Sequence, residues 1–160
     1  MALLFFVLFF AFTVDLAQII NKQYVVGQYS QSIVRTVAVQ GGISQGAPTN
    51  FPDGSRGYRT SLNVYNQIAT KLKDSAKIDS FDVYLTSYNE NGDVTSMVTL
   101  NPGTTFVVDY QKRFEIEVRY RYKWTITSQM VPGLSSTVEK KVRRSGVSEY
   151  KYNYDDWGGK

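Results

Sequence analysis

The side chains that could do chemistry in this chain are carboxylates, hydroxyls, lysines and arginines, because its 160 residues include no cysteine and no histidine. That composition excludes disulfides, thiolate nucleophiles, Cys/His zinc sites and the usual acid/base residue of near-neutral pH. No Ser/Lys pair or carboxylate pair has a spacing that indicates catalysis. We therefore predict that the protein is not an enzyme and has no catalytic, cofactor-binding or metal-binding residues.

Two short segments carry oxygen atoms of the kind that bind cations, Asp53-Gly54 and Asn91-Gly92-Asp93. Neither has the ligand spacing of a calcium-binding loop. Asn-Gly is also the preferred centre of a two-residue hairpin turn. We interpret both segments as turns.

Basic side chains gather in the second half of a chain whose net charge is +4. They could contact an anionic polymer or phosphate, or they could pair across strands with nearby glutamates. We favour pairing and expect no nucleic-acid partner. The basic set is Arg119, Arg121, Lys123, Lys140, Lys141, Arg143 and Arg144, and the acidic set is Glu115, Glu117, Glu139 and Glu149.

Asp15 stands alone in a long apolar run at the N-terminus. Residues 2–14 read ALLFFVLFFAFTV, and Leu16, Ala17, Ile19 and Ile20 continue the run. A buried charge without a partner is costly. Two environments for Asp15 therefore stay open: the solvated headgroup level of a membrane, or a defined partner in an assembly, such as a neighbouring chain.

The apolar run indicates the first half of one long helix over residues 1 to about 40. Apolar residues at helical spacing continue to Val37, and Gly41-Gly42 is a strong stop signal. The first half has no polar face, so it must be buried in lipid or among copies of the same helix. No basic segment precedes it and no small-residue cleavage site follows, which argues against a signal peptide. We assign residues 1–27 to a hydrophobic assembly or anchor helix and residues 28–160 to a globular head.

The remaining sequence predicts an α+β fold with a second helix over about 61–77 and an antiparallel sheet of about four strands. Residues 43–60 form a loop, and the tail 152–160 is a frayed end or a strap. Strict alternation from Phe114 to Ile126 places the even positions inward, against Val26, Tyr29, Ile33 and Val37. The strands are expected at 80–89, 94–100 and 114–126, and from 138 to as far as 150.

This plan resembles type IV pilins and pseudopilins, and residues 14–43 are similar to the pilin-like proteins of Tad-type systems. Those proteins have an apolar run, an acidic residue near its end, a Gln/Ala/Tyr-rich segment and a Gly stop. The matching features here are Asp15, Tyr24, Gln31, Arg35 and Gly41-Gly42. The resemblance covers about the first quarter of the chain. One feature departs from the pattern: type IV pilins carry Glu at the fifth mature position, which is Phe5 here if Met1 is the mature start.

The resemblance implies a structural subunit of an extracellular filament at the cell surface. The subunit would lose a short basic leader, reside in the inner or cytoplasmic membrane before assembly, and depend on a platform and an ATPase. Its homo-oligomeric interface would comprise Phe5, Phe6, Phe9, Phe10, Phe12, Val14, Asp15, Leu16, Ile19 and Ile20.

Two other functions stay open. The chain could be a minor pilin, or a membrane-anchored part of a secretion or conjugation machine. It could also be an anchored adhesin or binding module.

Overall fold

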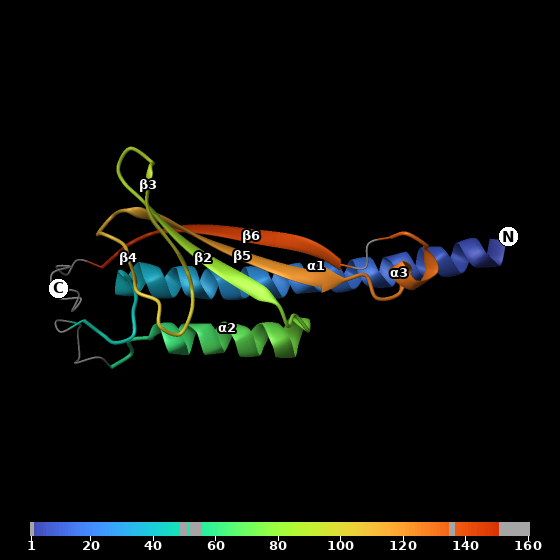
Figure 1. Cartoon of the computed structure of the whole chain (residues 1–160), viewed down its shortest axis with the longest axis horizontal. Helices are drawn as coiled ribbons and strands as arrows, with labels where there is room; N and C mark the ends of the chain where they lie inside the picture. Colours follow the sequence, from blue (N-terminus) through green and yellow to red (C-terminus); the bar gives the residue numbers. More distant parts are fainter. Residues whose placement is uncertain (1, 49–50, 52–55, 135–136, 151–160) are drawn as a thin grey trace.

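A computed structural model describes residues 2–48, 51, 56–134 and 137–150. One long helix runs the length of the molecule, with a second helix beside it and an antiparallel sheet packed along it (Figure 1). This is the α+β fold that the sequence predicts. The Asp53-Gly54 segment and the tail 152–160 lie outside the described residues.

Helix α1 (Ala2–Gln40) is a single helix of 39 residues. At about 1.5 Å per residue it is roughly 58 Å long. The burial of its side chains changes along its length. Val26, Ile33, Val34 and Val37 lie in the core, whereas the side chains of the first turns are almost all exposed. The one helix therefore belongs to the head at its C-terminal end and projects from it at the other.

The helix ends at the predicted glycines, and the second of them begins a strand of a small two-stranded sheet. Gly41 has φ +74°, and the next residue begins strand β1 (Gly42–Ile43). A Cβ on Gly42 would lie 2.2 Å from the Phe106 carbonyl oxygen of the partner strand β4 (Phe106–Val107). Only glycine allows β1 and β4 to pair so directly after the helix.

Helix α2 (Ser61–Ala76) has defined caps at both ends. The Thr60 side chain accepts a hydrogen bond from the Asn63 N–H at 3.2 Å. At the other end Lys77 adopts φ +53°, and its N–H reaches the Leu72 and Lys73 carbonyls. The predicted boundaries of this helix are confirmed within a residue.

The main sheet has four antiparallel strands in the order β3-β2-β5-β6. Strands β2 (Phe81–Tyr88) and β5 (Arg113–Lys123) are central, and the edges are β3 (Val94–Thr99) and β6 (Thr137–Val147). Val118 lies opposite Val83 on one side and Val142 on the other. This register puts apolar side chains of three strands on one face, where α1 and α2 cover them.

The predicted inward face of β5 is confirmed from Phe114 to Tyr122, whose even positions are buried with Val26, Ile33 and Val37 of α1. The prediction is wrong at its end. Strand β5 stops at Lys123, Trp124 is half-buried, and Ile126 is 37 % exposed. The chain leaves the sheet there because residues 126 and 127 turn to contact Asp15, an interaction that alternation along the strand cannot reveal.

The hairpin between β2 and β3 also differs from its prediction. It is a wider loop, closed by a hydrogen bond from the Asn89 N–H to the Asp93 carbonyl at 2.9 Å. Gly92 takes φ +86°, so the loop keeps its glycine but is not a two-residue turn. The Asn89 Oδ1 atom accepts a hydrogen bond from the Asp93 N–H at 2.8 Å, so this side-chain oxygen stabilises the turn.

Candidate functional site

The N-terminal turns of α1 form an apolar tip, which we define as residues 2–10. Six large side chains in it are between 65 % and 82 % exposed, namely Leu3, Leu4, Phe5, Phe6, Phe9 and Phe10. Five consecutive residues at about 100° per residue point to every side of a helix, and residues 3–7 are all exposed. The tip therefore has no side that its own chain covers.

By length and composition α1 is a helix that could cross a membrane, and most of its apolar stretch is not buried by the rest of the chain. An anchor and a targeting sequence share these properties. The tip itself is short: nine residues at about 1.5 Å give roughly 14 Å, about half of a bilayer core.

The ten predicted interface residues divide into two groups. Phe12, Leu16 and Ile20 are 45 %, 40 % and 59 % exposed, and the four tip residues Phe5, Phe6, Phe9 and Phe10 are more exposed still. Asp15 and Ile19 are buried in their own chain, and Val14 is half-buried. Burial by the head begins at Ala11, so the free part of α1 is shorter than the segment 1–27 assigned to it.

Asp15 has neither of the two environments expected from the sequence. Its carboxylate accepts hydrogen bonds from the Thr127 N–H at 2.7 Å and the Ile126 N–H at 3.0 Å, both to Oδ2. These two amides begin the short helix α3 (Thr127–Met130), whose first N–H groups have no partner within the helix. The side chain is only 2 % exposed. The partner that the buried charge requires is thus the backbone of the same chain.

Around Asp15 the segment 124–134, which we call the collar, lies against α1 (Figure 1). The Trp124 ring stacks on the Phe12 ring with centroids 6.1 Å apart. Three large side chains of the collar point outward, with Ile126, Met130 and Leu134 between 36 % and 41 % exposed. The collar therefore continues the apolar surface of the tip towards the head.

Sequence reasoning missed the collar. We interpreted Trp124 and Ile126 as the end of the strand that begins at Phe114. The available signal was Asp15 itself, because a lone acid in an apolar helix needs hydrogen-bond donors, and free backbone N–H groups at a helix start supply them.

On the sheet face away from α1, the cross-strand pairing that we favoured is found for two of the basic residues, Arg121 and Arg143, which pair between β5 and β6. Arg119 and Arg143 both donate to the Glu117 carboxylate, and Arg143 lies 3.6 Å from Glu115. Burial alone would raise the pKa of Glu117, but the hydrogen bonds and charges of Arg119 and Arg143 outweigh it and hold that pKa below its ordinary value. Arg119 also lies over the Tyr84 ring. Among the described residues Arg119, Arg121 and Arg143 are thus paired with glutamates, whereas Lys123, Lys140, Lys141 and Arg144 take part in none of the ion pairs.

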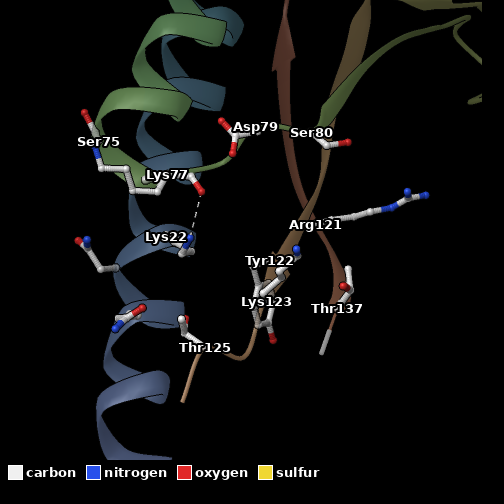
Figure 2. Close-up of a pocket in the computed structure, with 13 residues that line it drawn as sticks. Lys22, Ser75, Lys77, Asp79, Ser80, Arg121, Tyr122, Lys123, Thr125 and Thr137 are labelled. Carbon is white, nitrogen blue, oxygen red and sulfur yellow. Dashed lines mark hydrogen bonds between the residues drawn. The ribbon is translucent and has the colours of Figure 1, made fainter. Parts of the chain in front are cut away.

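A cleft of about 730 Å³ opens between α1, the end of α2 and the end of β5 (Figure 2). Lys22 reaches across it and donates to the Lys77 carbonyl at 3.3 Å. Four cations line the cleft, Lys22, Lys77, Arg121 and Lys123, against one carboxylate, Asp79. The lining of the cleft is thus cationic. Among the described residues no group of three or more Asp, Glu, His or Cys is placed to hold a metal ion.

Comparison of the chain with protein-family models, with curated proteins and with solved structures finds no match.

Proposed function

We propose that this chain is a structural pilin subunit, which assembles through its N-terminal helix into an extracellular type IV-like filament. The observation that supports this most is the apolar tip, exposed on every side while the head has a complete core of its own. Burying one large apolar side chain is worth about 1.5–3 kcal/mol. Six such side chains on each subunit provide a strong drive to pack tips together.

Before assembly the same tip would rest in the cytoplasmic membrane. Lipid and a bundle of like helices both cover an all-apolar surface, so one element serves both states. Platform proteins and an ATPase would move the subunit from one state to the other. The proposed chemistry is non-covalent self-assembly without catalysis.

A second candidate is a minor pilin or an anchored component of a secretion or conjugation machine, and an anchored adhesin is a third. Asp15 is buried within its own chain, so its charge does not require a neighbouring subunit. This burial does not favour either alternative over the pilin subunit.

In both alternatives the tip stays in lipid and the head binds a partner. Electron microscopy and mass spectrometry of material sheared from cells separate the candidates. A filament made chiefly of this chain supports the proposal, and recovery only from membranes supports an alternative.

Phe9→Asp tests the role of the tip. A charge among packed apolar helices costs several kcal/mol, so we expect filament yield to fall below detection while the melting temperature of the head is unchanged. Leu62→Asp is the control, because Leu62 is also a large exposed side chain, at 47 %, but lies on α2. Normal filaments from the Phe9→Asp chain, or equal losses from both variants, would contradict the proposal.

A further inference from the structure

The part of the chain that forms β2, β3 and β4 carries acidic side chains only. Residues 78–111 contain no lysine or arginine, and their carboxylates are Asp79, Asp82, Glu90, Asp93 and Asp109. The four cations of the cleft come instead from α1, from the residue that follows α2 and from β5. Acidic and basic side chains of the head are therefore concentrated in different places.

The loop of the β2–β3 hairpin, which we define as residues 89–93, presents two of these carboxylates at the surface. Residues 90–95 are all exposed, and the Glu90 side chain is 83 % exposed. Figure 1 shows the hairpin rising away from α1 at the end of the head. Lys112 pairs with Glu90, whereas Asp93 takes part in none of the ion pairs among the described residues. The hairpin loop is thus an acidic projection.

The cleft offers the complementary charge. In the described part of the chain Lys77 and Lys123 are exposed and belong to none of the ion pairs, while Arg121 lies 3.5 Å from Glu139. Figure 2 shows Lys22 beneath the end of α2, where it donates to the Lys77 carbonyl. With a volume of about 730 Å³ the cleft is large enough to receive several side chains.

The hairpin loop cannot reach the cleft of its own chain. Ser87, just before the loop, lies opposite Phe114 near one end of β5, whereas Lys123 at the other end of β5 lines the cleft. The strand from Phe114 to Lys123, at about 3.4 Å per residue, spans roughly 30 Å. The two complementary surfaces can therefore meet only between two copies of the chain.

Two copies that point in the same direction can make this contact. A shift of one copy by roughly 30 Å along α1, towards the N-terminus of the other, brings its hairpin loop level with the cleft. Since α1 rises about 30 Å from Lys22 to Ala2, the head of the shifted copy then lies beside the collar and the apolar tip. The contact joins two different surfaces, so it repeats from copy to copy along a filament and does not close in a pair.

We propose that the cleft receives the hairpin loop of a second copy of this chain, with the loop carboxylates facing the cleft lysines. The occupant is set by opposite charge and by the positions of the two surfaces at opposite ends of β5. This inference rests on the proposed function, because subunits of one filament share a direction and are displaced along its axis.

Disulfide cross-linking tests the contact in membranes of cells that produce the full chain. The sequence has no cysteine, so every cross-link reports an introduced pair. Asn91→Cys/Ser80→Cys places one thiol in the hairpin loop and one at an exposed position of the cleft. We expect oxidation to give a ladder of dimers, trimers and larger species. The control Asn91→Cys/Ser145→Cys moves the second thiol to an exposed position of β6 outside the cleft and should give dimers at most.

Charge reversal in the Asn91→Cys/Ser80→Cys chain supplies a second measurement. Lys77→Asp/Lys123→Glu reverses the cleft, and Glu90→Lys/Asp93→Lys reverses the loop. Aspartate suits position 77 because it tolerates the left-handed backbone there. Either reversal should lower the yield of the ladder by about tenfold or more, since like charges then face one another. Both reversals in one chain should restore it.

Lys71→Glu/Lys141→Glu is the matched control, because it reverses two exposed lysines that do not line the cleft and should keep the ladder. Melting temperatures of the purified chains check that each variant is folded.

Three results would overturn the proposal: no ladder from the Asn91→Cys/Ser80→Cys chain, equal losses in the reversed and control variants, or no recovery when both reversals are combined. A ladder that is lost on reversal of the cleft but not of the loop would assign the cleft to a different acidic partner. Filaments without a ladder would keep the proposed function and remove this contact. A ladder in membranes of cells that never form filaments would keep the contact and remove the proposed function.

Discussion

Asp15 shows how one carboxylate can be buried in an apolar helix at little cost. Its oxygens satisfy two amides at the start of α3, and those amides in turn satisfy the carboxylate. Removing the charge weakens both bonds and leaves buried donors under-satisfied, at a cost of about 1–3 kcal/mol. The effect should be local, because the core of the head lies further along α1.

For Asp15→Asn we therefore expect faster amide hydrogen exchange at Ile126 and Thr127, with unchanged exchange in β2 and β5. Gln18→Asn, at an exposed position of the same helix, is the control. Unchanged exchange in the collar would mean that packing of Trp124 on Phe12 holds it without Asp15.

Glu117 gives the head a pH-dependent contribution to stability. Its pKa is lowered in the folded state by Arg119 and Arg143, so the contribution is present above the unfolded value near 4.5 and is lost as pH falls through the folded value. Glu117→Gln should cost about 1 kcal/mol at neutral pH. Melting curves measured from pH 7 to pH 3 should show that the stability difference between wild type and Glu117→Gln disappears below about pH 4.5. Glu139→Gln should be nearly silent throughout, since Glu139 and Arg121 are both more than half exposed. A constant gap would refute the linkage.

At the scale of elements, β5 tests the assignment of the sheet faces. Val118 is fully buried between Val83 and Val142, so Val118→Glu should cost several kcal/mol. Lys141→Glu places the same side chain on the outward face beside Arg119, and should change stability by less than about 0.5 kcal/mol. Arg119 itself is a poor control because it pairs with Glu117. Equal losses in urea unfolding would show that the faces are wrongly assigned.

The elements were predictable where a local period or a stop signal defines them. The apolar spacing of α1, the Gly41-Gly42 stop and the alternation of β5 each act within a few residues. The collar was not predictable, because its decisive hydrogen bonds join residues 111 and 112 positions apart. The cleft was missed for the same reason: it joins side chains of α1, the end of α2 and β5, which no local pattern relates.

Over the whole molecule, polarity changes in order along one axis. The apolar tip comes first, then the collar, then the cationic cleft, and then the core of the head. Because α1 passes through all four regions, their spacing is fixed by a helical rise of about 1.5 Å per residue.

Strands β5 and β6 lie lengthwise along α1 and are paired over all 11 residues of each strand (Figure 1). Hydrogen bonds of an antiparallel pair lie perpendicular to the strands. A tensile force along the long axis would therefore load these bonds in shear, so that they resist together, whereas a force across the axis would open them one after another. A subunit of this design is mechanically strong in the direction in which its tip would be pulled.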